Sequence, residues 1–318
     1  MTDKLAFKTA MTFAYGEPSE MARGVVRLVA DNPGPFTFKG TNTYLIGTGR
    51  LSVVDPGPDD AAHRDAILRA AAGRPIDFII ATHTHKDHVD GLAALAAVTG
   101  ARTAGFGRAA AATPGDAAPT PSGDAFTAPF SPDVVLGDGD VLETQDHALL
   151  ALHTPGHAPD HLCLSVDTGH GPEALISGDH VMAWNTSVVA PPEGRMADYL
   201  ASLDRLIGRP ETVFLPGHGG RVEEPQRLVK AYLLHRRWRE QAIMAVIRER
   251  ASSGATPATI RTIVPVVYPD LDARLLQAAT LSVQAHVEHL MERDLVSSPS
   301  LPAAGDATWD RELCPAPA

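Results

Sequence analysis

The sequence lacks most features of a secreted or membrane-spanning protein. Only two of its 318 residues are cysteine, Cys163 and Cys314, so no disulfide framework is indicated. No run of about 20 apolar residues could cross a bilayer. The first residues also lack the apolar segment and small-residue cleavage site of a secretory signal. We therefore expect a cytoplasmic protein with no membrane partner.

Positive charge is also scarce. The chain has 27 Lys and Arg against 38 Asp and Glu, which gives a formal net charge of −11. This balance disfavours general binding to nucleic acids or anionic membranes. The one basic cluster, HRRWRE at residues 235–240, is interpreted as a solvated helix face. Hydrophobic residues make up 44% of the chain, enough for one large core or two smaller ones.

Residues 1–221 combine short apolar runs with helical segments, and this pattern indicates an α/β fold. The runs are β-branched or leucine-rich and are bounded by Gly, Pro, Asp or Asn, as strands usually are. Residues 107–140 are dominated by Ala, Pro, Gly, Ser, Thr and Asp, which predicts a long loop or insertion. We expect strands at 25–30, 42–47, 51–55, 77–82, 147–153, 162–167, 174–179 and 212–218, and helices at 59–73, 90–100 and 196–208.

Residues 222–296 read as a separate helical domain. Helices are expected at 225–250, after a cap at Thr256 with Pro257 in the first turn, and at 271–296. The third helix has few outward basic side chains for a DNA groove, so no DNA partner is expected. A lid or side wall for an active site, or a homodimer contact, fits this domain better, and the oligomeric state stays open. Residues 297–318, rich in Ser, Pro and Ala, are predicted to be a disordered tail.

A dense group of metal-ligand side chains follows the apolar run IDFIIAT. The segment THTHKDHVDG holds His83, His85, Asp87 and His88, and imidazole nitrogens and carboxylate oxygens are ligands that zinc accepts. Four other apolar runs also end in such a residue. Because ligand sites gather at the carboxyl ends of strands, we expect all of these side chains to meet. The four additional residues are Asp55, His153, Asp179 and His218.

The motifs THTHKDHVDG, HTPGH, SGDH and PGHG, in this order, resemble the metallo-β-lactamase superfamily. GTNTYLIG followed by VVDPGP fits the opening of that fold, and the resemblance covers residues 20–220. The helical segment resembles the winged-helix-like appendix of the beta-lactamase-like protein 2 subgroup, which includes an endoribonuclease and many uncharacterised bacterial hydrolases. The resemblance implies a four-layer αβ/βα sandwich plus a small helical, winged-helix-like C-terminal domain.

The resemblance also implies a ligand set. His83, His85 and His153 would hold one metal, Asp87, His88 and His218 a second, and Asp179 would bridge them. Asp87 and Asp179 are the expected catalytic residues, with Asp87 orienting the attacking hydroxide or accepting a proton. Asp55 and His180 are expected to support the ligands from behind. Within HTPGHAPDH, His157 and His161 are predicted to form hydrogen bonds or pack.

These roles predict a binuclear hydrolase with two divalent metal ions. Zn²⁺ is the expected metal, with Mn, Fe or Co as alternatives. A hydroxide between the two cations would attack an ester, a thioester or a related small molecule. Three alternatives stay open: an endoribonuclease for single-stranded RNA, a mononuclear iron enzyme like the persulfide dioxygenases, and a metal-stabilised binding module without turnover. A narrow apolar pocket would favour small esters, and an open groove lined by Arg108, Arg195 or Arg236 would favour RNA.

Overall fold

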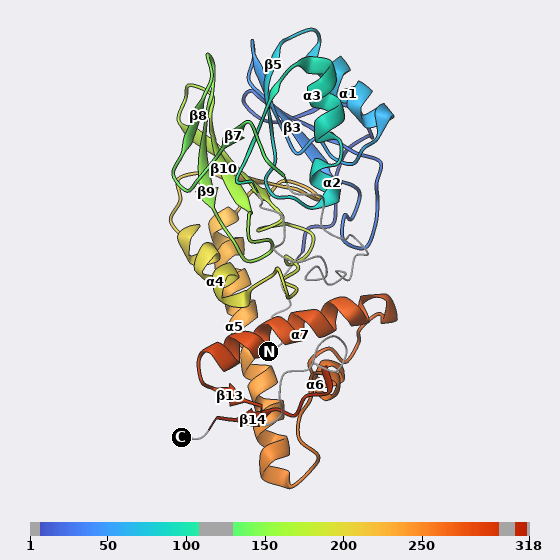
Figure 1. The fold of residues 1–318 in the computed structure, drawn as a ribbon, viewed down its shortest axis with the longest axis vertical. Helices are drawn as coiled ribbons and strands as arrows, with labels where there is room; N and C mark the ends of the chain where they lie inside the picture. The colour runs from blue at the N-terminus through green and yellow to red at the C-terminus, as the bar shows by residue number, and fades with distance from the viewer. Residues whose placement is uncertain (1–6, 108–129, 299–308, 317–318) are drawn as a thin grey trace.

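Two β-sheets lie face to face in the computed structural model, which describes residues 7–107, 130–298 and 309–316 (Figure 1). The larger sheet has the strand order β1-β2-β3-β4-β5-β6-β7. Its strands are antiparallel from β1 to β4 and parallel from β4 to β7. The seven strands are β1 Ser19–Ala22, β2 Val25–Val29, β3 Asn42–Ile46, β4 Leu51–Val54, β5 Ile76–Ile80, β6 Arg102–Gly105 and β7 Val134–Val135.

The smaller sheet has the order β12-β11-β10-β9-β8, and β11 and β12 are its one parallel pair. Successive side chains of each strand point to opposite faces of the sheet. In β9, Leu149 and Ala151 point into the core between the sheets, and Leu150 and Leu152 pack in the core on the outer side. The strands are β8 Val141–Glu143, β9 Ala148–His153, β10 Leu162–Asp167, β11 Pro172–Gly178 and β12 Val213–Pro216.

Helices cover the outer face of each sheet, which makes four layers (Figure 1). The helices α1 Ala61–Ala71 and α3 Leu92–Thr99 pack on the larger sheet. Helix α1 begins at Asp60, whose side chain accepts a hydrogen bond from the Ala62 backbone N–H, and α3 ends at Gly100 in the left-handed conformation. The smaller sheet is covered by α4 Met196–Arg205 and by the first part of α5 Pro225–Ser253. The predicted αβ/βα sandwich is confirmed.

The C-terminal part of the chain is helical, as predicted, but α5 is shared between the two parts. Its first half, with Val229 and Tyr232, packs in the core behind the smaller sheet. Its second half, with Ile243 and Ile247, packs in a separate core with α6 Ile260–Val267 and α7 Leu276–Glu292. A short 3₁₀ turn, η1 Ala273–Leu275, precedes α7. In Figure 1 this second core lies below the sandwich.

Two expectations about the C-terminal region need correction. Helix α6 is capped by Thr259 rather than Thr256, because Thr259 and Thr262 form a reciprocal capping box. The tail is not disordered where it is described, since β14 Cys314–Pro315 pairs with β13 Val296–Ser297. Within 107–140, residues 108–129 lie outside the described part, and the remainder supplies β7 to the larger sheet. The short strands β1, β6 and β8 were also not predicted. Of the helices searched, none combines the length and apolarity needed to span a bilayer.

Candidate metal centre

The candidate ligands come from strand ends of both sheets and meet at one edge of the sandwich. His83 and His85 follow β5, and Asp87 and His88 lie on the short helix α2 Lys86–Val89. On the smaller sheet, Asp179 follows β11 and His218 follows β12. His157 lies in the loop after β9. The carboxyl ends of these strands therefore gather their side chains at one place, as is typical of ligand sites in α/β proteins.

The first group consists of His83, His85 and His157. Nδ1 of His85 lies 2.9 Å from Nε2 of His83 and 3.0 Å from Nε2 of His157. His157 donates its Nδ1–H to the Val188 carbonyl oxygen at 2.7 Å, which leaves Nε2 as a bare lone pair. The Thr82 hydroxyl donates to Asp55, so it must accept from Nδ1 of His83, whose Nε2 is then also bare.

This convergence of nitrogens fits a metal cation. The Nε2 lone pairs of His83 and His157 both face Nδ1 of His85. Nδ1 of a neutral His85 carries at most one hydrogen, so it can donate to only one of them. Burial, together with neighbouring histidines, lowers the pKa of His83 well below its ordinary value and the pKa of His85 to about 3. The rings of His83 and His85 therefore stay neutral, which is the form that binds metal.

The second group consists of Asp87, His88 and His218. Nε2 of His218 lies 3.1 Å from Oδ2 of Asp87, and Nε2 of His88 lies 3.4 Å from the same oxygen. Burial lowers the pKa of His218, but Asp179 and Asp87 outweigh burial and raise that pKa to about 9. The pKa of His88 is likewise raised well above its ordinary value, because Asp87, Asp55 and Asp179 outweigh burial. This group therefore holds positive charge, and a cation can supply that charge in place of protons.

Asp179 lies between the two groups. Its Oδ2 is 3.6 Å from Nε2 of His157 and 3.4 Å from Nε2 of His218, and its Oδ1 is 3.7 Å from Nε2 of His88. Neither Asp179 Oδ1 nor His88 Nε2 has a hydrogen-bond partner among the described residues, although both atoms are buried. Gly217 leaves the space for them, since a Cβ there would lie 2.5 Å from Asp179 Oδ1 and 2.7 Å from His88 Cε1. The donor set thus fits a metal centre, and Asp179 lies between its two groups of donors.

Asp55 supports the ligands from behind, as predicted. The residue is 1% exposed and follows β4 in a left-handed conformation (φ 50°) that aspartate tolerates better than most residues. Its Oδ1 accepts the Thr82 N–H at 2.8 Å, and its Oδ2 accepts the Thr82 hydroxyl and Nδ1–H of His88, both also at 2.8 Å. Asp55 therefore fixes the ring of His88 so that Nε2 faces Asp87 and Asp179.

The metallo-beta-lactamase superfamily model matches residues 36–218. The chain belongs to this superfamily. It is accordingly a hydrolase. A model of the beta-lactamase associated winged helix domain matches residues 259–309. The chain is 31% identical to the "Beta-lactamase-like protein 2 homolog" of Drosophila melanogaster over 86% of this chain and 89% of the relative.

Two further similarities extend this result. The chain is 28% identical to the "Atrochrysone carboxyl ACP thioesterase" of Passalora fulva, over 84% of this chain and 74% of the relative. A solved structure of a beta-lactamase domain protein from Burkholderia ambifaria superimposes with a TM-score of 0.75 at 22% identity, covering 96% of this chain and 95% of that one. This structural likeness shows that the solved structure shares the fold of nearly the whole chain, the sandwich together with the helical C-terminal region.

One predicted ligand of this metallo-β-lactamase centre is wrong. His153 does not join the cluster: its Nε2 contacts the Pro159 carbonyl oxygen at 2.8 Å, and its ring stacks on Phe106. His157 takes the expected place, because the loop after β9 carries it back over the strand ends. His153 was predicted because it stands at the end of a strand. The better signal was the sequence Pro-Gly-His, whose histidine is the candidate ligand both in Pro155-Gly156-His157 and in Pro216-Gly217-His218.

His161 and His180 also flank the centre. His161 forms hydrogen bonds, as predicted, since its Nε2 accepts the backbone N–H of Asp179 at 3.1 Å and its Nδ1 contacts the Thr154 hydroxyl at 2.9 Å. His180 was expected to support the ligands, but neither of its ring nitrogens has a hydrogen-bond partner in the described chain. Its ring instead packs against Tyr199 at 4.7 Å. His180 is therefore a packing residue beside the site.

Asn42 is a positioning residue that the sequence analysis missed. Its side-chain amide donates to the carbonyl oxygens of Pro216 at 2.8 Å and of Gly219 at 2.9 Å. Its backbone N–H donates to Gly217 at 2.7 Å. The start of β3 thus holds both sides of the turn that presents His218. The signal was the polar Asn-Thr pair at the start of an otherwise apolar strand.

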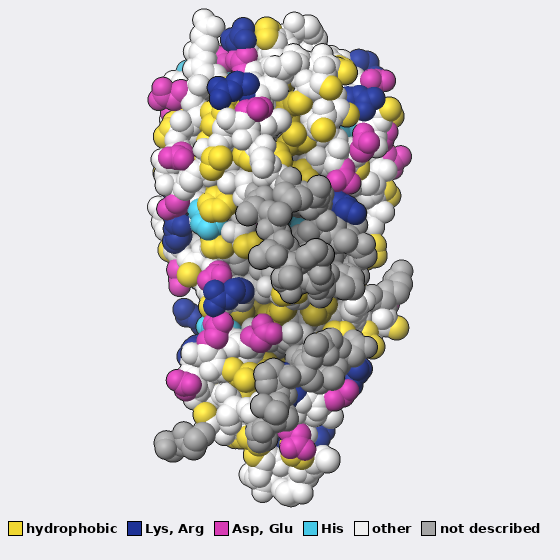
Figure 2. Space-filling view, viewed as in Figure 1, with side chains coloured by type: hydrophobic (Ala, Val, Ile, Leu, Met, Phe, Trp, Pro, Cys, Tyr) yellow, Lys and Arg dark blue, Asp and Glu magenta, His cyan; other side chains and the backbone are white. Residues whose placement is uncertain are grey.

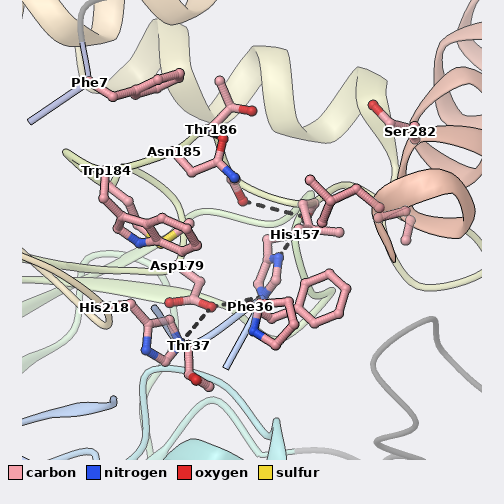
Figure 3. A pocket seen from close by; sticks show the side chains of 18 of the residues that line it. Phe7, Phe36, Thr37, His157, Asp179, Trp184, Asn185, Thr186, His218 and Ser282 are labelled. Atoms are coloured by element: carbon pink, nitrogen blue, oxygen red, sulfur yellow. Dashed lines mark hydrogen bonds and ion pairs between the residues drawn. The ribbon is translucent and has the colours of Figure 1, made fainter. Parts of the chain in front are cut away.

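A cavity of about 360 Å³ opens over the cluster. His157, Asp179 and His218 turn toward one another at its base, and Ser282 of α7 lies on a far wall (Figure 3). Both parts of the chain therefore enclose one pocket. The apolar side chains in its lining include Phe7, Phe36, Met182, Trp184, Leu271 and Leu275.

Proposed function

We propose that this protein hydrolyses small-molecule thioesters, or closely related esters, at a centre of two Zn²⁺ ions. The observation that carries the proposal is the cavity over the donor cluster. A volume of about 360 Å³ suits a small molecule, and apolar side chains such as Phe36, Trp184 and Leu271 line it beside the donor cluster. Such a pocket buries an acyl chain and presents the reacting carbonyl to the donors.

The arginines argue against an RNA groove. Arg195 does not line the cavity but forms surface ion pairs with Asp198 at 3.2 Å and Glu292 at 2.8 Å. Arg108 lies outside the described residues, and Arg236 lines the cavity as a buried side chain. On the face drawn in Figure 2, basic and acidic side chains are interspersed. Single-stranded RNA needs a continuous positive groove, so these features support a small substrate instead.

The comparisons support the same class of substrate. The relative from Passalora fulva is named a thioesterase that acts on an acyl carrier protein, and it aligns with 84% of this chain. That alignment is long enough to include both the metal centre and part of the helical wall. The name belongs to that relative, and we extend only the reaction class, thioester hydrolysis, to this protein.

The residues at the donor cluster and in the cavity lining have separate roles in the proposed reaction. When bound, the metals would lower the pKa of a water and stabilise negative charge on the carbonyl oxygen. Asp87 lines the cavity at the cluster and is the candidate acceptor for the proton that the water loses. The Thr41 hydroxyl, 3.4 Å from Oδ2 of Asp87, orients that carboxylate. Phe36 and Trp184 keep bulk water from the acyl group.

A substrate panel tests the proposal. Purified protein is incubated with short acyl thioesters, the matching oxygen esters and single-stranded RNA. We expect thioester hydrolysis that falls at least about a hundredfold in Asp87→Asn and His88→Ala. His170→Ala is the matched control, because this histidine lies on an exposed turn away from the cluster. RNA cleavage that disappears in the same variants, with no thioester turnover, would contradict the proposal.

Elemental analysis tests the metal centre separately. Two groups of three donors with Asp179 between them favour two metal ions. We expect about two zinc ions per chain, and chelation should remove both the metal and the activity. One iron per chain with oxygen consumption would support the persulfide-dioxygenase alternative instead. Bound metal with no turnover of any substrate would support the binding module.

A further inference from the structure

Two arginines line the end of the cavity formed by α5. Arg236 and Arg239 lie three residues apart, so their side chains lie on the same face of the helix. Both line the cavity that Asp87 and His157 border at the metal centre. The thioester chemistry proposed above uses neither arginine.

Arg236 is a buried charge with no acidic partner. The residue is 3% exposed, and one of its terminal nitrogens donates to the Ser187 carbonyl oxygen at 2.5 Å. Its guanidinium lies 5.1 Å from the ring centre of Tyr199, and its Nε has no hydrogen-bond partner. Among the residues that the structure describes, no carboxylate forms an ion pair with it. Burying a charge without a counter-charge is costly, so this arrangement favours an anionic ligand.

Arg239 adds a second positive charge to the same wall. Its guanidinium lies 3.9 Å from the ring centre of Tyr268, and it donates to the Val267 carbonyl oxygen at 2.6 Å. Its Nε also lacks a partner, as does Nδ1 of the neighbouring His235. Within the described ranges, Arg239 again has no paired carboxylate. Burial lowers the pKa of His235 to about 3, with a further contribution from the two arginines, so this ring stays neutral beside them.

The nearest acidic residue of the helix does not neutralise these charges. Glu240 contacts Nδ1 of His289 at 2.5 Å and the guanidinium of Arg293 at 3.3 Å. Both of these partners belong to the C-terminal region, and Glu240 is not part of the cavity lining. Glu193, which also lines the cavity, lies 4.0 Å from Nε2 of His85 at the metal centre. Among the described residues, no carboxylate of the lining therefore forms an ion pair with either arginine.

One short loop connects this wall to the metal centre. The Ser187 carbonyl oxygen accepts from Arg236, and the next carbonyl oxygen, that of Val188, accepts from Nδ1 of the metal donor His157. Consecutive residues lie about 3.8 Å apart along the backbone. The guanidinium and the metal donor thus flank the same loop, and a substrate in the cavity can reach both.

We propose that Arg236 and Arg239 form a subsite for an oxyanion, a carboxylate or a phosphate, carried by the substrate several bonds from the scissile carbonyl. The subsite rests on the proposed function, which it deepens by specifying an anionic thioester. Planar guanidinium groups match the oxygens of carboxylates and phosphates, and such charge-assisted hydrogen bonds are the strong ones. The charge could lie on the acyl part, as a carboxylate, or on the thiol part, as a phosphate.

Matched substrate pairs distinguish these sources. Hexanoyl and adipoyl thioesters of N-acetylcysteamine differ by a terminal carboxylate, and hexanoyl thioesters of pantetheine and 4′-phosphopantetheine differ by a phosphate. We expect one anionic member to be preferred about tenfold or more in kcat/KM, mainly through KM. Arg239→Gln should reduce this preference to near unity and leave the neutral substrate unchanged, and Arg239→Lys should restore part of it. Arg237→Gln is the matched control, since Arg237 is exposed on the same helix.

A binding measurement separates this subsite from the proposed function. Inorganic phosphate should raise the melting temperature of the metal-loaded protein, and this shift should shrink in Arg239→Gln and in Arg236→Gln but not in Arg237→Gln. If thioesters are hydrolysed with no preference for either anion, or if the preference survives in both cavity variants, the subsite is wrong and the proposed function stands. If no thioester is hydrolysed but the phosphate effect depends on the two arginines, the subsite stands and the proposed function is wrong.

Discussion

Alanine substitutions of His157 and of His153, which is four residues earlier, should have different effects on metal binding. His157 supplies a bare Nε2 3.0 Å from Nδ1 of His85, and its side chain is 8% exposed. Loss of a residue that merely supports a metal ligand costs 10–100-fold in metal affinity, so loss of this ligand should cost at least about 100-fold, or about 2.8 kcal/mol. We therefore expect His157→Ala to bind the first metal at least that much more weakly and to lose hydrolysis.

His153→Ala is the matched comparison. This side chain stacks on Phe106 with ring centres 4.2 Å apart, so its loss should cost about 1 kcal/mol of stability and no metal. Chelator competition followed by elemental analysis measures the affinities, and thermal unfolding with and without chelator measures the linked stability. The reasoning is refuted if His153→Ala loses the metal while His157→Ala retains two ions per chain.

Three other predictions concern the surroundings of the centre. Asp55→Asn should weaken metal binding about 10–100-fold in chelator competition, because the amide no longer fixes His88 as a carboxylate does; unchanged affinity would contradict this role. Gly217→Ala should abolish metal binding and activity, because the added Cβ would lie too close to Asp179 and His88. Gly220→Ala, where a Cβ has room, should stay active. Equal activities of the two variants would show that the residues around Gly217 can move aside. Burial lowers the pKa of His63 to about 4, so its contribution to stability is complete above pH 6.5 and declines as the pH falls toward 4. Urea unfolding at pH 7 and pH 5 should show a loss of stability that is about 2 kcal/mol smaller in His63→Gln than in the unchanged protein, and an equal loss in both proteins would exclude a contribution from this histidine.

Most of the centre could be predicted because its ligands stand directly at strand ends. His83, His85, Asp87 and His88 follow a buried strand within a few residues, so local sequence fixes their position. His157 does not follow directly, since three residues of loop separate it from His153. Which histidine in a loop reaches a cluster depends on the loop path, and that path is set by tertiary contacts such as the Val188 carbonyl. The role of Asn42 was missed for the same reason, because its partners lie more than 170 residues away.

The fold shows the same division between local and distant causes. Strands that are buried along all or nearly all of their length, such as β3 and β10, were predicted because they consist mostly of apolar residues. The edge strands β1 and β8 are short and half polar, and β7 has two residues. These strands exist because a neighbouring strand offers free backbone groups, which no local pattern reports. The pairing of β13 with β14 depends likewise on a contact between distant segments.

Helix α5 sets how this protein can be divided. At 29 residues it is a rod of about 44 Å, and its two halves are buried in different cores. A cut at residue 221 would strip Val229 and Tyr232 from the sandwich and expose its outer sheet. Fusions or exchanges of the C-terminal region should therefore join within α5, near Arg239, rather than in the loop before it. A natural exchange at that joint would alter the chemistry of the pocket wall while leaving the metal ligands untouched.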